Sequence, residues 1–274
     1  MDAVTELLAA SHFADPGVLP IAVLAVLLVG LSKGGLGGAF GLMGVPILSL
    51  TMPPVQAAAL FLPILLVMDW VGLWTWRGTY HAPTLRAMLP AALVGIGFGA
   101  LTAAVTPEAL VRLIVGLIAV GFAIWSVWPQ RGPQAEPSRN PGAAKPEART
   151  RSAWIWGTAT GFTSFVAHAG GPPFQVHTLP LRLDPKVYTG TAVVFFAVVN
   201  AVKVVPYAAL GQFDARTLLS AATMIPVAVV AVRLGAAAVR RMRPQVFYPF
   251  MIAMVALVGL RLVYDGLVGL LGAG

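Results

Sequence analysis

Four polar residues occur inside long apolar stretches of the sequence, where they could bind an anion or carry a proton: Lys33, Lys203, Asp69 and Asn200. An ammonium group inside a membrane is strongly unfavourable unless it meets a carboxylate, an anion or water. Lys33 and Lys203 are therefore candidates for binding an anionic substrate. Asp69 is a mid-span carboxylate and a candidate for proton coupling. A structural ion pair between Asp69 and one of the lysines is the alternative.

The segment around Lys33 is rich in glycine and reads GLSKGGLGGAFGLMGVPIL from Gly30 to Leu48. Such a run is a poor helix and favours a tight re-entrant bend, with backbone N–H groups exposed at the start of the next half-helix, where an anion is attracted. Close packing of helices explains the glycine spacing equally well. The candidate substrate-binding residues in this segment are Ser32, Lys33, Gly34, Gly35, Gly37 and Gly38.

A second interrupted segment reads GFTSFVAHAGGPPFQVHTLPL from Gly161 to Leu181. Its Gly-Gly-Pro-Pro sequence predicts a break, followed by a half-helix that restarts near Phe174, because proline is favoured in a first helical turn. The polar side chains around this break are candidates for the substrate site, and hydrogen bonding between helices is the alternative. The substrate-binding candidates are Thr163, Ser164, Gly170, Gly171 and Gln175, and the further candidates for proton coupling are His168 and His177.

The composition defines the environment of these residues. The chain of 274 residues is 58% apolar and only 10% charged, with a mean hydropathy of +0.84, which excludes a soluble domain, since these carry about 25% charged residues. The net charge of +8 comes from loops beside apolar spans, and this indicates a positive-inside bias rather than nucleic-acid binding. The absence of cysteine excludes disulfides and thiolate metal sites. We expect an all-α polytopic protein in a lipid bilayer, with no cofactor and no metal.

Two halves with the same order of segments are predicted, each a broken hairpin followed by three transmembrane helices. The first half, 1–128, contains hairpin 18–50 and spans 55–76, 87–105 and 109–128; the second, 154–274, contains hairpin 154–181 and spans 187–209, 217–239 and 245–263. Residues 129–153 between them are rich in proline and basic residues, which predicts a flexible, water-exposed linker.

The halves resemble a repeat, because Gly30 matches Gly161 and Asp69 matches Asn200 at the same offset of 131 residues. With the linker on the cytoplasmic side, the inward loops hold twelve basic residues and the outward ends only Arg112 and Arg216. This asymmetry predicts periplasmic termini and halves of opposite orientation, as in inverted-repeat transporters.

Other charged and aromatic residues have simpler explanations. Arg233 and Arg261 lie toward the ends of their spans, where arginine can extend its head group to the membrane surface. The seven tryptophans, which include Trp70, Trp74 and Trp76, mostly lie near predicted span ends. An interfacial belt explains them, and we expect no chemistry from them.

The two hairpin sequences and the repeat joined by a polar linker resemble the TauE/SafE family of sulfite and organosulfonate exporters, from Gly30 to about Leu262. Lys33-Gly34-Gly35 matches the Lys-Gly-Gly of the family's first hairpin, and Gly170-Gly171-Pro172 matches the Gly-Gly-Pro of the second. The second half has no lysine equivalent to Lys33. The resemblance implies a bacterial inner-membrane transporter of small sulfur-containing anions such as sulfite, sulfoacetate or related sulfonates.

Both lines of reasoning predict alternating access, with the anion held near the midplane between the two hairpins. A passive anion channel with the same polar lining is one alternative. An intramembrane hydrolase is the other, because Ser164 and His168 are four residues apart and on a helix could act as nucleophile and base. No G-x-S-x-G surrounds Ser164, so we predict no catalytic residues and no enzymatic activity.

Overall fold

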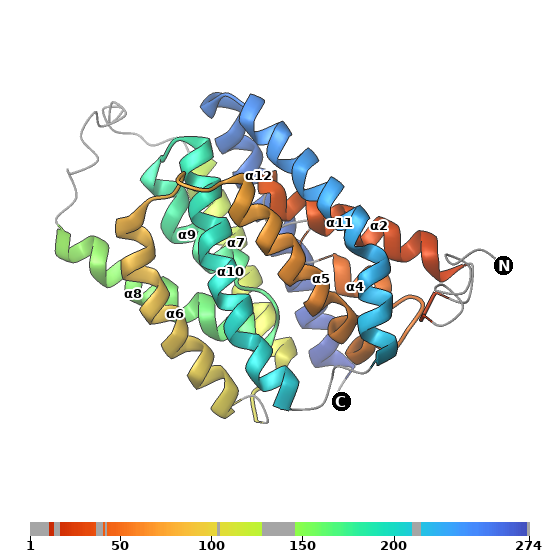
Figure 1. Cartoon of the computed structure of the whole chain (residues 1–274). Coiled ribbons are helices and arrows are strands. Elements are labelled where there is room, and N and C mark those ends of the chain that lie inside the picture. The colour runs from red at the N-terminus through yellow and green to blue at the C-terminus, as the bar shows by residue number, and fades with distance from the viewer. Residues whose placement is uncertain are drawn as a thin grey trace. The chain divides into compact units, whose positions relative to one another are not determined.

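The computed structural model describes residues 11–13, 17–36, 41, 43–102, 105–127, 146–209 and 215–272. Every regular element in these ranges is a helix (Figure 1), which confirms the predicted all-α class. Six helical segments of the described chain are long and apolar enough to cross a membrane: Val18–Leu36, Ala82–Thr102, Glu108–Val127, Pro185–Val205, Ala215–Arg241 and Pro244–Leu271. The chain is therefore a polytopic helical membrane protein.

The three spans predicted in each half are all helical. In the first half they are α5 (Pro54–Thr75), α6 (Ala82–Thr102) and α7 (Glu108–Val127), and in the second α10 (Pro185–Ala209), α11 (Ala215–Arg241) and α12 (Pro244–Leu271). Three of these helices, α5, α10 and α12, begin at a proline, whose fixed φ and missing N–H suit the first helical position.

The first hairpin consists of α2 (Val18–Leu31), a π-helical turn η1 (Ser32–Leu36) and the short helix α4 (Gly44–Leu48). Its break lies at Gly35, whose φ of 133° is in the region that favours glycine. The glycine run therefore interrupts the helix, as predicted. Two of the predicted site residues, Gly37 and Gly38, lie outside the described residues.

The second hairpin consists of α8 (Pro146–Val166), α9 (Gly171–Thr178) and a 3₁₀ turn η2 (Leu179–Leu181). The break predicted from Gly-Gly-Pro-Pro is present, but α9 begins at Gly171 rather than near Phe174, because both prolines fit its first turn. Helix α8 begins at Pro146, inside the predicted linker 129–153. The preceding part of that linker lies outside the described residues.

The chain forms two compact units, and each combines helices from both halves of the sequence. Unit 1 comprises Met1–Tyr80 and Pro185–Arg243, and unit 2 comprises His81–Asp184 and Pro244–Gly274. Unit 1 therefore holds the first hairpin with α5, α10 and α11, whereas unit 2 holds the second hairpin with α6, α7 and α12. The units do not coincide with the two predicted halves.

Small residues bring the helix backbones close together inside each unit. In unit 1, a Cβ at Gly235 of α11 would overlap the carbonyl oxygen of Leu31, at the end of α2. In unit 2, a Cβ at Gly161 of α8 would overlap the carbonyl oxygen of Ala92 in α6. Such contacts are typical of membrane helices, where close van der Waals packing replaces the hydrophobic driving force. They hold each broken hairpin against a continuous helix.

Candidate functional site

Three of the polar residues selected from the sequence form one hydrogen-bonded group in unit 1. Lys33 Nζ donates to Asp69 Oδ1 at 2.6 Å, and Asn200 Nδ2 donates to Asp69 Oδ2, also at 2.6 Å. The three side chains come from η1, α5 and α10. Asp69 and Asn200 are buried, and the Lys33 side chain is 19% exposed. The ion pair that the sequence left as an alternative is therefore present for Lys33.

Lys203 belongs to the same region of unit 1. It lies about one helical turn beyond Asn200 on α10, is only 3% exposed, and interacts electrostatically with both Asp69 and Lys33. We call Lys33, Asp69, Asn200 and Lys203 the lysine–aspartate cluster. It contains two lysines and one carboxylate, and both oxygens of that carboxylate already accept a hydrogen bond.

Two aromatic residues, Phe196 and Trp76, contact the first hairpin. Neither was predicted from the sequence to belong to the site. Lys33 Nζ lies 5.9 Å from the centre of the Phe196 ring, on the same helix as Asn200. Trp76 is buried, and its Nε1 donates to the carbonyl oxygen of Gly34 at 3.2 Å. The interfacial interpretation is thus wrong for Trp76, which fixes the hairpin break to the end of α5. Trp70 and Trp74 remain exposed, at 72% and 65%.

The remaining predicted residues of the first hairpin lie on the π-helical turn itself. Ser32 begins η1 and is half-buried, Gly34 is buried, and Gly35 supplies the break. A Cβ added at Gly41 would lie 3.0 Å from Ser32 Oγ, so the described end of the glycine run returns to the start of the turn. The predicted residues of this hairpin that the structure describes are therefore close together in unit 1.

In unit 2, the hydroxyl groups of the second hairpin mainly stabilise its own backbone. Thr163 Oγ1 donates to the carbonyl oxygen of Ala159 at 2.8 Å and approaches that of Ala169 at 3.2 Å. Ser164 is buried against Gly170, where a Cβ would lie 2.7 Å from the Ser164 Cβ. The Thr163 hydroxyl therefore connects the end of α8 to the chain that leads into α9, and both of these acceptors belong to its own hairpin.

Gln175, on α9, differs from these hydroxyl groups. It is only 4% exposed, and its Oε1 is one of two buried side-chain polar atoms in the described chain that have no hydrogen-bond partner. Buried polar groups are almost always hydrogen-bonded, so an exception calls for an explanation such as a ligand or an ordered water. Gln175 is therefore the strongest substrate-binding candidate of the second hairpin.

The N-terminus of α9 is a weaker anion site than the sequence suggested. Pro172 and Pro173 have no N–H, and the N–H of Phe174 donates to the carbonyl oxygen of Gly170 at 3.3 Å. Among the first three residues of α9, only Gly171 offers a backbone donor. Any polar recognition at this hairpin must come mainly from side chains.

The two histidines of the second hairpin occupy different environments. His168 is exposed and lies beyond the end of α8, with a left-handed φ of 53°. The helical spacing on which the Ser164 and His168 hydrolase hypothesis depended is therefore absent. His177 is buried, and its Nδ1 lies 2.9 Å from Ser152 Oγ on α8.

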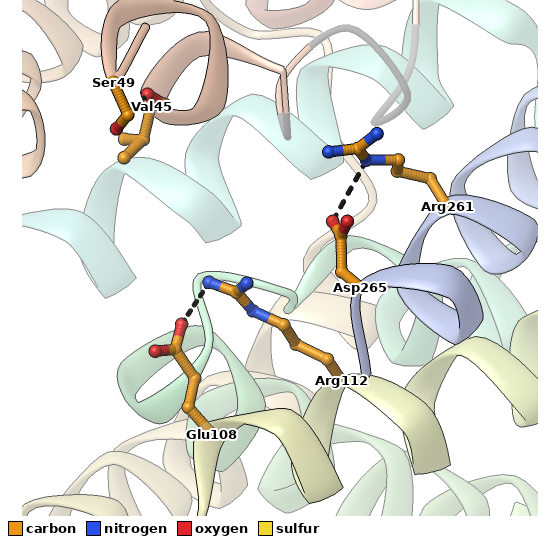
Figure 2. Close-up of polar contacts among 6 residues, drawn as sticks. All are labelled: Val45, Ser49, Glu108, Arg112, Arg261 and Asp265. Carbon is orange, nitrogen blue, oxygen red and sulfur yellow. Dashed lines mark hydrogen bonds and ion pairs between the residues drawn. The ribbon is translucent and has the colours of Figure 1, made fainter. Parts of the chain in front are cut away.

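Two arginines in unit 2 pair with carboxylates on their own helices, as Figure 2 shows. Arg112 bonds Glu108 on α7, and Arg261 Nε donates to Asp265 Oδ2 at 3.0 Å on α12. Both pairs have helical i, i+4 spacing. Arg233, on α11 of unit 1, is exposed. Of the four basic residues inside apolar runs, only the two lysines share a buried carboxylate; Lys203 is itself buried and Lys33 is half-buried.

Broken hairpins packed on apolar spans, with charged residues inside them, are typical of polytopic membrane transport proteins. The chain matches the family model described as sulfite exporter TauE/SafE over residues 22–262, nearly its whole length, and it belongs to this family. No curated protein and no solved structure gives a match. Because the family consists of transporters, the protein is a membrane transporter and not an enzyme.

Proposed function

We propose that this protein exports small sulfur-containing oxyanions, of the sulfite or sulfonate class, across the bacterial inner membrane by alternating access. The lysine–aspartate cluster carries this proposal, because it combines two lysines with a single carboxylate beside the broken first hairpin. We further propose that the linker is cytoplasmic and that both termini are periplasmic, as the distribution of basic residues predicts.

The charge balance of the cluster explains why an anion would bind there. Asp69 can neutralise one ammonium group, and it already accepts hydrogen bonds from Lys33 and Asn200. When both lysines are charged, one positive charge remains uncompensated in an apolar surrounding, which is unfavourable. A small oxyanion with oxygen atoms on several sides can accept hydrogen bonds from both ammonium groups and balance that charge.

The position of the cluster favours a transporter built from two related halves. Asp69 and Asn200 are equivalent in the predicted repeat, and they contact each other directly. Residues that a two-fold axis exchanges can touch only close to that axis. The cluster would therefore lie where the two halves meet, which is where inverted-repeat transporters bind their substrates.

Equivalent glycine contacts in the two units also support the repeat. In unit 2, a Cβ at Gly99 would lie 3.2 Å from Phe165 and 3.5 Å from the carbonyl oxygen of Phe162. In unit 1, a Cβ at Gly235 would meet Gly34 and the carbonyl oxygen of Leu31. Gly99 matches Gly235 in the predicted repeat at an offset of 136 residues. At the offset of 131 residues Leu31 matches Phe162 and Gly34 matches Phe165, so the partners of these two glycines also correspond.

Competition for Lys33 offers a way to couple transport to protons. The Lys33 ammonium group bonds Asp69 at 2.6 Å. A bound anion would compete with Asp69 for this hydrogen bond. Protonation of Asp69 would remove its charge and release Lys33 to the anion, while deprotonation would restore the ion pair and favour release. We propose Asp69 as the main coupling residue, with His168 and His177 as further candidates.

The second hairpin would contribute neutral polar groups to recognition. The unpartnered Oε1 of Gln175 can accept a hydrogen bond from a protonated substrate oxygen or from a water that bridges to the substrate. Ser164, Gly170 and Gly171 lie beside it in sequence on the same hairpin. The contrast in charge between the hairpins holds around the breaks, where the first hairpin carries Lys33 and the second half has no equivalent lysine.

Binding to the purified protein tests the proposed substrate class. We expect saturable binding of sulfite or a sulfonate such as sulfoacetate, measured by calorimetry in detergent against a panel that also contains taurine, thiosulfate and sulfate. Preference for sulfate over every member of the sulfite and sulfonate class would refute the substrate assignment. Binding of none of them would refute the proposal as a whole.

A further inference from the structure

The second unpartnered polar atom in the described chain lies beside the first hairpin, outside the site that the sequence predicted. Thr189, on α10 in unit 1, is only 1% exposed, and its Oγ1 has no hydrogen-bond partner. Together with Gln175 Oε1, it completes the pair of such atoms in the part of the chain that the structure describes. Each of the two broken hairpins therefore has one unpartnered buried polar atom associated with it.

The Thr189 side chain faces the break of the first hairpin. A Cβ added at Gly35 would lie 2.6 Å from Thr189 Cγ2 and 3.2 Å from Thr189 Oγ1. The hydroxyl group is thus next to the one residue of η1 whose backbone is left-handed. The absence of a side chain at Gly35 allows the backbone of the turn to approach this hydroxyl group closely.

A comparison with Thr191 shows that this arrangement is not the usual one for threonine in a helix. Thr191 lies on the same helix and is equally buried, and its Oγ1 donates to the carbonyl oxygen of Val187 at 2.6 Å. Thr160 and Thr178 bond their own helices in the same way. The Thr189 hydroxyl lacks such a bond although it lies in a helix, so the free energy of burying it is not offset inside the protein.

The electrostatic surroundings of Thr189 favour an anion as its ligand. Thr189 lies about one turn from the N-terminus of α10, which begins at Pro185 and carries the positive end of the helix dipole. Arg240 of α11 lies over the Trp76 ring at 5.2 Å, and Trp76 in turn bonds the residue before Gly35. The Arg240 guanidinium group also donates to the carbonyl oxygen of Thr75 at 2.6 Å, so it is held at the end of α5. A hydroxyl donor near a helix N-terminus suits an oxyanion.

We infer that Thr189 and the backbone at Gly35 form a second oxyanion subsite in unit 1, on the same turn as Lys33 but distinct from the Asn200 side of the lysine–aspartate cluster. Thr189 and Asn200 are about 16 Å apart along α10, given the rise of a helix per residue, so one small anion cannot contact both. The subsite lies toward the loop predicted to be cytoplasmic. An exported anion would occupy it before it reaches the cluster, an assignment that rests on the proposed function.

The test compares Thr189→Val, which keeps the shape but removes the hydroxyl group, with Thr189→Ser, which keeps the hydroxyl group. Sulfite export is measured from inverted or right-side-out proteoliposomes, so that either face can be supplied with substrate, and the melting temperature is measured without substrate. We expect Thr189→Val to raise the KM for sulfite supplied at the face predicted to be cytoplasmic by about tenfold. Its melting temperature should be unchanged or higher, because no internal hydrogen bond is lost. Thr189→Ser should retain the wild-type KM.

Thr191→Val is the matched control, because its hydroxyl group bonds Val187. It should lower the melting temperature and leave the KM unchanged. A wild-type KM in Thr189→Val would overturn the subsite and assign the hydroxyl group to an internal water. A melting temperature lowered as much as in Thr191→Val would overturn it also, in favour of a structural role. Loss of sulfite binding in Lys203→Met at an unchanged melting temperature, with wild-type behaviour of Thr189→Val, would retain the proposed function and reject this subsite alone.

Discussion

The two broken hairpins occupy equivalent places in the predicted repeat but have different chemistry. The first breaks at a glycine with positive φ and presents Lys33 to a buried carboxylate. The second breaks before two prolines and presents hydroxyl and amide groups. Around the two breaks, the charged lysine thus lies in unit 1, whereas the second break, in unit 2, carries neutral hydroxyl and amide groups. Each of the following changes tests one side of this division.

The largest effect is expected from Lys33→Met, which leaves Asp69 buried without its ammonium partner. Removing one member of a buried ion pair is strongly destabilising, and we expect a loss of about 3 kcal/mol, since Lys33 is partly exposed. The double variant Lys33→Met with Asp69→Asn should recover most of the stability but not substrate binding. Thermal unfolding in detergent and calorimetric binding separate the two effects. Wild-type affinity for the substrate in the double variant would show that Lys33 is not part of the binding site.

Lys203→Met should separate binding from stability more cleanly. Lys203 shares the carboxylate with Lys33 and repels it, so its removal should leave the melting temperature unchanged or raise it. Loss of a charge-assisted hydrogen bond to the anion should weaken binding by about tenfold or more. Arg233→Met, which removes an exposed cation from the same unit, is the control and should bind as the wild type does. If Lys203→Met is strongly destabilised but still binds sulfite, then Lys203 stabilises the fold and does not bind the substrate.

In the second hairpin, Gln175→Leu and Thr163→Val should have opposite effects. The Gln175 Oε1 has no internal partner, so its loss should weaken substrate binding several-fold with little effect on folding. Thr163 bonds the backbone around the break, and its replacement should cost about 1 kcal/mol of stability without changing affinity. Unchanged binding in Gln175→Leu would confine recognition to unit 1.

Much of the cluster could be predicted from sequence because buried charge in an apolar span must find a partner. Asp69, Lys33 and Lys203 were selected for this reason, and Asn200 because it is the repeat equivalent of Asp69. The same reasoning did not reveal which lysine bonds the carboxylate, since that depends on the bend at Gly35. The structure resolves this in favour of Lys33.

Other features depend on side-chain geometry that a single sequence does not encode. In the sequence, Trp76 cannot be distinguished from an interfacial tryptophan. Its role depends on the Gly34 carbonyl group, which the structure shows as its hydrogen-bond acceptor. Thr189 and Thr191 are the same residue type on one helix, and only the packing of Gly35 against α10 distinguishes them. The composition of the compact units was also not predictable, because a repeat describes the order of helices and not which of them pack together.

The central claim is that the protein moves a sulfur oxyanion against its concentration gradient and that Asp69 couples this movement to protons. Sulfite accumulation in proteoliposomes, with and without a pH gradient, tests it most directly. We predict that the wild type concentrates sulfite above equilibrium only when the gradient is present. Asp69→Asn should still bind sulfite but lose the dependence on the gradient. Flux that stops at equilibrium in the wild type would contradict the claim and indicate a passive channel, and unchanged gradient dependence in Asp69→Asn would exclude Asp69 as the coupling residue.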